Sequence, residues 1–431
     1  MEMPKIYVNP PRSEWPALTA RCTRQEEEIG ERVAAILAEV RTGGDAALRR
    51  IVRRIEGYVP ETFEVTRKRR AEAAKAVSPQ LKAALAQAKA NIEAFHRAQL
   101  PAQVEVETMP GVRCVQRAVA IGRAGLYIPG GKAPLFSTVL MLALPARIAG
   151  CREVILCTPC GRDGRIAPEI LYAADLCGVD RVFALGGAQA VAAMAYGTES
   201  IPRVDKIFGP GNRYVTKAKQ LAGAADVAVD LPAGPSEVLV LADEDARPEF
   251  AAADLLSQAE HGDDSQAVLV CRSEEFARRA IASVGEQAAR LSRREAIGNS
   301  LANSRIVVFS DPDEQIAFAD AYAPEHLIIA MRDAWDAAAR ITAAGSVFIG
   351  GYSPESAGDY ASGTNHTLPT GGWARAYSGV NTESFMRKIT YQELTRGGLE
   401  ALAPTITAMA EAEGLDAHAN AVRIRTEGGA R

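Results

Sequence analysis

A carboxamide and an imidazole three residues apart give the first indication of chemistry in this sequence. Gln258 and His261 come at the end of an apolar helical segment that starts at Pro248, and Gly262 is expected to end that helix. Side chains three apart on a helix share one face. Their oxygen and nitrogen atoms can therefore bind one cation from the end of a rigid element, and we expect the rest of the chain to supply further ligands.

Glu325 and His326 are the second pair of residues that can do chemistry. Pro324 disfavours helix at Ala323, so the pair is expected in a turn that leads into the apolar strand 327–330. The mouth of a strand is where α/β enzymes place catalytic side chains. The carboxylate and the imidazole can divide proton transfer between them, the carboxylate can fix one tautomer of the ring, or the two can form a loop salt bridge.

A polar segment after a late strand offers a third ligand. Residues 351–366 contain too few large apolar side chains for a core, which is typical of a binding loop, and they include Asp359. The C-terminal tail adds His418, either to its own chain or to a partner. With Gln258 and His261 these residues form a mixed nitrogen and oxygen set that suits zinc, with manganese or cobalt as substitutes. Each of them would also fit a solvated surface.

The elements that must position these groups alternate between strand and helix. Two sets of short apolar runs, one over 119–121, 153–157, 182–185, 206–208 and 227–229 and one over 237–241, 267–271, 305–309, 326–330 and 346–349, predict two parallel sheets. Such a molecule binds ligands in the crevice between its lobes. No G-x-G-x-x-G follows any of these strands, so chemistry alone leaves a dinucleotide site undecided.

Composition excludes several classes of protein. The net charge of −4 and the absence of a long basic run argue against nucleic acid and anionic membranes as partners. The N-terminus resembles no secretory signal, and the most apolar window is too short to span a bilayer. Seven cysteines in such a chain indicate reduced thiols and a cytoplasmic protein. Cys157 and Cys160 have CxxC spacing, but the apolar run before them favours packing at a strand end.

Long motifs then identify a family. The sequence resembles histidinol dehydrogenase from about residue 25 to residue 425, in the segments GLYIPGGKAPLFSTVLM (125–141), GGAQA (186–190), VDKIFGPGNRYVTKAK (204–219), LPAGPSEVLVLAD (231–243), DLLSQAEHG (254–262), APEHL (323–327), AGSVFIG (344–350) and SPESAGDYASGTNHTLPT (353–370).

The resemblance implies an α/β fold with two Rossmann-like parallel-sheet lobes that are incomplete and lack the glycine fingerprint. A small N-terminal helical arm and a C-terminal helical tail complete it. We expect an arm over 1–24, a first lobe over 25–124 plus 237–378 with the metal and catalytic residues, a second lobe over 125–236 with the cofactor contacts, and a tail over 379–431 that is exchanged in a homodimer.

The resemblance also implies the reaction and the residues that perform it. L-Histidinol would be oxidised through L-histidinal to L-histidine by an NAD-dependent alcohol and aldehyde dehydrogenase with one Zn²⁺ per active site. His326 would remove the hydroxyl proton and Glu325 would activate water. The zinc ligands would be Gln258, His261, Asp359 and His418. The remaining substrate contacts would be Ser236, His366 and Glu413, and the cofactor contacts would be Tyr127, Gln189 and Asn212. His418 and Glu413 would come from the partner, so that the active site is shared.

Three other functions remain as alternatives. A related zinc and NAD dehydrogenase could oxidise another small primary alcohol, although Glu413 and His418 favour histidinol. A zinc hydrolase would use Glu325 to activate a metal-bound water and would need no NAD. A metal-binding protein without enzymatic activity would bind zinc and form no NADH.

Overall fold

A six-stranded parallel sheet carries Glu325 and His326. The computed structural model describes residues 3–21, 27–130, 134–161, 163–232 and 234–427. The strand order is β1-β11-β10-β9-β12-β13, and the central strands are buried throughout, as a parallel sheet covered on both faces requires. The strands are β1 (Lys5–Val8), β9 (Glu237–Ala242), β10 (Gln266–Cys271), β11 (Arg305–Val308), β12 (His326–Ala330) and β13 (Ser346–Ile349). All five strands expected between residues 237 and 349 are present.

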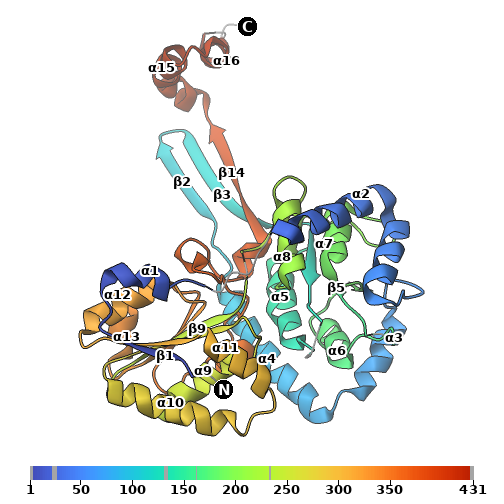
Figure 1. The fold of residues 1–431 in the computed structure, drawn as a ribbon. Coiled ribbons are helices and arrows are strands. Elements are labelled where there is room, and N and C mark those ends of the chain that lie inside the picture. Colours follow the sequence, from blue (N-terminus) through green and yellow to red (C-terminus); the bar gives the residue numbers. More distant parts are fainter. Residues whose placement is uncertain (1–2, 22–26, 131–133, 162, 233, 428–431) are drawn as a thin grey trace.

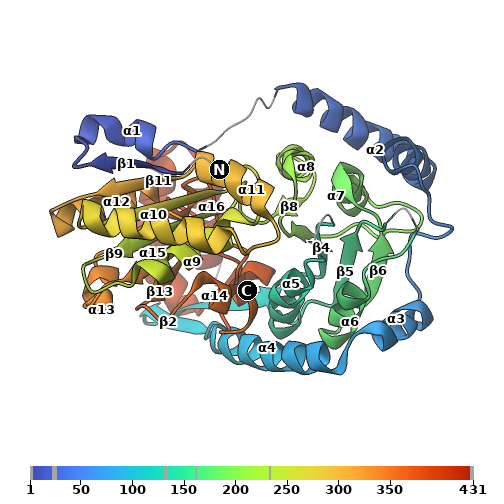
Figure 2. The same cartoon turned by 60° about the horizontal axis from the view of Figure 1, so that its bottom comes forward.

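Helices cover both faces of this sheet (Figure 2). One face packs against α9 (Pro248–Ala259), α10 (Glu274–Ala288) and α11 (Arg294–Ala302). The other packs against α12 (Pro312–Tyr322), α13 (Ala334–Ala338) and α1 (Trp15–Leu18). Residues 5–18 of the expected N-terminal arm therefore belong to this lobe, because β1 pairs with β11 and Trp15 is buried against Phe318. Residues 1–2 and 22–24 of that arm lie outside the described residues.

A five-stranded parallel sheet forms the second lobe, with the order β6-β5-β4-β7-β8. Its strands are β4 (Arg123–Tyr127), β5 (Glu153–Thr158), β6 (Arg181–Ala184), β7 (Lys206–Phe208) and β8 (Ala228–Val229). Helices α5 (Phe136–Ala149) and α6 (Pro168–Leu176) cover one face, and α7 (Gly187–Tyr196) and α8 (Arg213–Gly223) cover the other. The expected first strand of this sheet at 119–121 is wrong. Val119 and Ala120 are the last residues of an antiparallel strand that pairs with residues 386–394, and the parallel sheet has β4 instead.

The helices between residues 27 and 98 pack against the second lobe. Helix α2 (Glu27–Glu56) lies against α7 and α8, α3 (Arg67–Ala73) against α6, and α4 (Pro79–Ala98) against α5. These three helices thus lie against the helices of the second lobe, whereas the expected division groups residues 25–124 with 237–378. The physical reason is that an amphipathic stripe shows that one helix face is buried, but does not show which sheet covers it.

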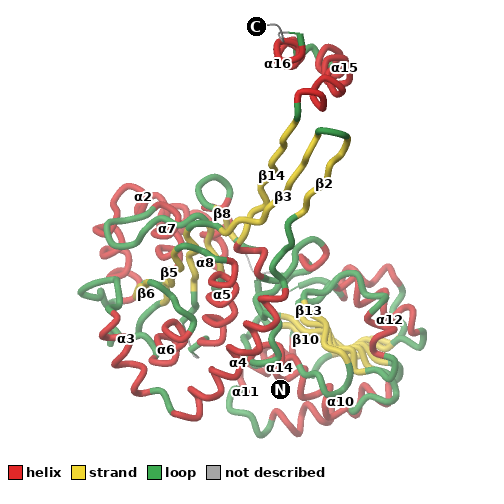
Figure 3. The backbone as a smooth tube through the Cα atoms, turned by 180° about the vertical axis from the view of Figure 1, so that it is seen from behind, coloured by secondary structure: helices red, strands yellow, loops and turns green. Residues whose placement is uncertain are grey.

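A three-stranded antiparallel sheet projects away from both lobes and ends in two helices (Figures 1 and 3). Its strands are β2 (Val104–Met109), β3 (Val112–Ala120) and β14 (Met386–Leu394), and the terminal helices are α15 (Arg396–Ala412) and α16 (Asp416–Thr426). The expected tail is thus helical over α15 and α16, whereas its first part forms a strand, β14, that the sequence pattern does not predict. Of the helices that the structure describes, none has the length and apolar character needed to cross a membrane.

The α/β class with two parallel-sheet lobes is confirmed. Short helical segments complete the chain at Arg12–Glu14, Ala74–Ala76, α14 (Glu355–Tyr360), Trp373–Arg375 and Thr382–Phe385. Of these, α14 contacts α9, so it brings the polar segment 351–366 to the end of the helix that carries Gln258.

Candidate functional site

Glu325 and His326 lie in the turn between α12 and β12. Helix α12 ends at Tyr322, and Ala323 adopts a left-handed conformation with φ 50° before Pro324 starts the extended chain. His326 is the first residue of β12 and pairs with Val238 of β9. The expected turn is therefore present, but it lies at the amino end of the strand, whereas ligands of open α/β sheets usually bind at the carboxyl ends.

The imidazole of His326 is buried among carboxylates. Its Nε2 lies 3.5 Å from Asp359 Oδ1, and its Nδ1 lies 3.7 Å from Glu325 Oε2 and 3.8 Å from Glu355 Oε1. Burial lowers the pKa of His326, but the negative charges of Glu355, Glu325 and Asp359 outweigh burial and raise this pKa to about 10. These charges hold the ring protonated when no cation is bound, and a cation bound to Asp359 would lower this pKa so that the ring could accept a proton.

Glu325 is a carboxyl group that can exchange protons near neutral pH. It is buried, and burial raises its pKa to about 8, although His326 and the backbone N–H of Glu237 lower it. That N–H donates to Glu325 Oε2 at 2.9 Å. A carboxyl with such a pKa is suited to general base or acid catalysis.

Side chains that could bind a cation lie close to Glu325 and His326. One ligand atom each of His261, Glu355 and Asp359 lies within 4.8 Å of the others. Gln258 is buried at the end of α9, with its Nε2 3.4 Å from His261 Nδ1. The helix ends at Ala259 with Glu260 as a right-handed cap, so the expected helix end at Gly262 is wrong, although Gln258 and His261 still lie together.

These donors fit a divalent metal. Gln258 Oε1 and both carboxylate oxygens of Glu355 are buried with no hydrogen-bond partner among the described residues. A buried polar oxygen without a partner is costly, and a coordinated cation would relieve that cost. Imidazole, carboxamide and carboxylate donors suit zinc or a similar ion.

Glu355 is the site residue that the sequence prediction missed. It is the first residue of α14 and lies one helical turn before Asp359, so both carboxylates share one face. The four-residue spacing was visible in the sequence, but it carries information only if the segment is helical. We had expected a loop there.

Of the other predicted substrate contacts, the structure brings some to the donor group and leaves others far from it. His366 lies with the group, because its Nδ1 is 2.9 Å from the carbonyl of Asp359 and its Nε2 is 3.2 Å from Thr138 Oγ1 of the second lobe. Ser236 lies directly before β9. Glu413 and His418 lie at the end of α15 and in α16, on the projecting helices, so one chain does not bring them to the other donors (Figures 1 and 3).

The three predicted cofactor contacts line one cleft of about 1130 Å³ at the carboxyl ends of the five-stranded sheet. Tyr127 ends β4, and its phenol oxygen accepts the N–H of Gly187 at 3.1 Å; burial raises its pKa to about 12. Gln189 donates to Glu56 at 3.1 Å. Asn212 caps α8 through the N–H groups of its first turn.

A second, smaller cavity shares Asn212 with this cleft. It has a volume of about 490 Å³, and its other walls include Ser236 and Glu237. A close backbone approach shapes this region, because Gly209 has φ 119° and a Cβ there would lie 2.1 Å from the carbonyl oxygen of Tyr127. The two cavities therefore adjoin at Asn212, and the smaller one is lined by residues of both lobes.

The cysteines of the CxxC pair are free thiols. Cys157 is buried in β5, where burial raises its pKa, and Cys160 lines the large cleft. A buried thiol with a raised pKa is a poor nucleophile. These observations agree with strand-end packing for Cys157.

Comparisons with known proteins agree along the whole chain. A family model described as histidinol dehydrogenase matches residues 19–426. The histidinol dehydrogenase of Bacteroides fragilis (strain YCH46) is 55% identical over 427 residues, which cover 98% of this chain and 99% of the relative. That of Xylella fastidiosa (strain 9a5c) is 55% identical over 396 residues, 92% of each chain. A crystal structure of histidinol dehydrogenase from Elizabethkingia anophelis superposes with a TM-score of 0.97 at 46% identity and covers 99% of both chains.

The donor set predicts a measurable contribution of Asp359 to metal binding. We expect Asp359→Asn to weaken Zn²⁺ binding about a hundredfold, because it removes an anionic donor. Glu249→Gln, an exposed acid in the first turn of the same helix as Gln258, is the matched control and should bind zinc like the wild type. Competition with a chromophoric chelator measures both affinities, and equal affinities would remove Asp359 from the site.

Proposed function

The chain belongs to the histidinol dehydrogenase family, and we propose that it oxidises L-histidinol to L-histidine through L-histidinal, using zinc and two molecules of NAD. The reaction completes histidine biosynthesis, and we place it in the cytoplasm. The observation that carries the proposal is the convergence of Glu325 and His326 with Gln258, His261 and Asp359. These residues come from segments that are distant in the sequence.

The first oxidation needs a base at the substrate hydroxyl. We assign this role to His326, whose buried ring faces the donor set through Nε2. The hydroxyl proton passes to the ring while the carbon-bound hydrogen leaves as hydride to NAD, and the alcohol becomes an aldehyde. Zinc held by Gln258, His261 and Asp359 would fix the substrate through its imidazole and amino nitrogens, which makes positioning its main contribution.

The second oxidation needs a hydroxyl group on the aldehyde carbon. Glu325 takes a proton from water, whose oxygen adds to the aldehyde to form a diol. The diol loses a second hydride to NAD and a proton, and the acid results. One alcohol and one water thus yield one carboxylate, two NADH and three protons.

The cofactor would occupy the cleft of about 1130 Å³ that Tyr127, Gln189 and Asn212 line. Its size and its position at the carboxyl ends of the five-stranded sheet suit a nucleotide. The adjoining cavity beside Ser236 offers a route for the nicotinamide toward His326.

The active site is completed in a homodimer in this proposal. Helices α15 and α16 project from the lobes and expose Met409, Leu415 and Ile424, which is unfavourable for a lone chain. Exchange of this arm about a twofold axis would bury these side chains and bring Glu413 and His418 to the site of the other copy.

Stoichiometry tests the proposal directly. We expect purified protein with L-histidinol and NAD to form two NADH per histidine, measured by absorbance and amino-acid analysis. One NADH with free aldehyde would contradict the four-electron reaction. Turnover of another alcohol but not of histidinol would favour a related dehydrogenase, and turnover without NAD would favour a hydrolase.

Substitutions separate the two oxidations. We expect His326→Asn to slow the first oxidation by about 10²- to 10⁴-fold with zinc still bound, because asparagine cannot accept the proton. Glu325→Gln should slow oxidation of supplied L-histidinal about tenfold more than oxidation of L-histidinol. Single-turnover assays of each half-reaction measure these losses, and equal losses in Glu325→Gln would refute the division of roles.

Mixed dimers test the shared site. His261→Asn and His418→Asn chains should each be inactive alone, because each lacks one zinc ligand at both sites. After subunit exchange, the mixed dimers should regain up to about half of the activity of one wild-type dimer, because one of their two sites is intact. Verified exchange without recovery would show that the tail serves its own chain.

A further inference from the structure

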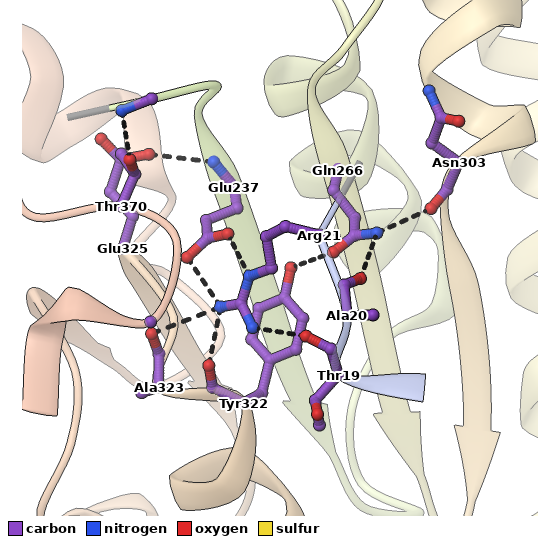
Figure 4. A network of polar contacts seen from close by, with 12 residues as sticks. Thr19, Ala20, Arg21, Glu237, Gln266, Asn303, Tyr322, Ala323, Glu325 and Thr370 are labelled. Atoms are coloured by element: carbon purple, nitrogen blue, oxygen red, sulfur yellow. Dashed lines mark hydrogen bonds and ion pairs between the residues drawn. The ribbon is translucent and has the colours of Figure 1, made fainter. Parts of the chain in front are cut away.

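We propose that Arg21 and Glu237 are positioning residues that hold Glu325, and to a lesser extent His326, in place for the two oxidations. The inference rests on the proposed function. Figure 4 shows the network that carries it, in which the end of the N-terminal segment reaches the catalytic turn.

The backbone of Glu237 contacts both catalytic residues. Its N–H donates to Glu325 Oε2 at 2.9 Å, and its carbonyl oxygen lies 3.4 Å from His326 Nδ1. Glu237 is the first residue of β9, the neighbour of β12 in the sheet. A shift of this one residue would therefore be transmitted to both side chains.

Arg21 fixes the side chain of Glu237. The guanidinium donates to both carboxylate oxygens, from Nε at 2.6 Å and from Nη2 at 2.8 Å. The ion pair is almost fully enclosed, with Glu237 1% and Arg21 17% exposed in their side chains. Such a two-point contact holds an orientation that a single charged contact does not.

The same guanidinium also holds the turn that precedes Glu325. It donates to the carbonyl of Tyr322 at 2.6 Å and lies over the Tyr322 ring at 3.5 Å. The next residue, Ala323, has a positive φ that a residue with a Cβ rarely adopts, so its neighbours must maintain it. Arg21 thus connects the start of β9 with the start of the turn that carries the catalytic pair.

A contribution to folding stability alone is a weak explanation for the Arg21–Glu237 ion pair. The desolvation of two buried charges largely cancels their attraction, so a buried ion pair contributes little net stability compared with apolar side chains. Its effect is to fix geometry. Positioning is relevant here because displacement of a catalytic group by about 1 Å can reduce the rate of a reaction about a hundredfold.

Glu325 depends on this arrangement more than His326 does. Among the described residues, the N–H of Glu237 is the only hydrogen-bond donor to the Glu325 carboxylate. His326 is held in addition by its place in β12 between β9 and β13 and by the carboxylates around its ring. Loosening of Glu237 should therefore affect water activation more than removal of the hydroxyl proton.

Arg21→Lys is the variant that tests the inference, because it keeps the charge and removes the two-point contact. We expect its kcat for L-histidinal to fall about tenfold, its kcat for L-histidinol to fall about threefold or less, and its KM values to stay within about twofold of wild type. Free aldehyde, captured with hydroxylamine, should consequently accumulate during histidinol oxidation. Glu237→Gln, which weakens the same contact from the other side, should show the same pattern if Arg21→Lys folds poorly.

Arg12→Lys is the matched control. Arg12 lies in the same N-terminal segment, pairs with Glu314 at 2.8 Å and lies over the ring of Trp15, but it contacts neither Glu237 nor the catalytic turn in the described structure. It should leave both half-reactions unchanged. Equal loss of both half-reactions in Arg21→Lys, unchanged rates, or the same pattern in Arg12→Lys would each overturn the inference. A wild-type protein that oxidises neither substrate would instead refute the proposed function, so the two failures are distinguishable.

Discussion

The burial of several carboxylates around one imidazole is the constraint on which the site depends. Removing a charged group from water costs several kcal/mol unless it is paired and hydrogen-bonded. Here Glu325, Glu355 and Asp359 surround His326, and the oxygens of Glu355 have no hydrogen-bond partner among the described residues. A protonated ring, a bound cation or a cationic substrate can compensate the excess of negative charge, and protonation of Glu325 and Glu355, whose pKa values burial raises to about 8, also reduces it.

The surrounding fold keeps these groups together by rigid attachment. His326 lies in a strand with a neighbour on each side, and Gln258 ends a helix that is buried against the sheet. Asp359 and Glu355 share a short helix that contacts the helix of Gln258. Each functional side chain thus comes from an element that apolar packing holds in place. Contacts within the polar cluster are therefore not needed to fix its position.

The sequence predicted those parts that local patterns determine. Apolar runs predicted the strands from Glu237 onward, Pro324 predicted the turn before His326, and three-residue spacing predicted the pairing of Gln258 with His261. Glu355 was missed because its role depends on a helix within a polar segment that lacks helical periodicity.

Long-range contacts were beyond prediction from local patterns. Arg21 and Glu237 are separated by 216 positions, so no spacing rule relates them. The helices between residues 27 and 98 have a clear apolar face. This pattern does not show which of the two sheets the face packs against. The arm formed by β2, β3 and β14 joins segments more than 250 residues apart by numbering, and only pairing in three dimensions reveals that the tail begins as a strand.

The two lobes bring opposite ends of their sheets to the candidate site. In the second lobe, Tyr127 and Asn212 line the cleft at the carboxyl ends of the strands, whereas His326 and Ser236 lie at the amino ends of the other sheet. A cavity that Asn212 shares with Ser236 joins the two edges. In the proposed function, a nucleotide bound on the second lobe would present its reactive end to the first lobe. The boundary of the cleft also depends on Gly209, which packs so closely on the backbone of Tyr127 that no larger residue fits there.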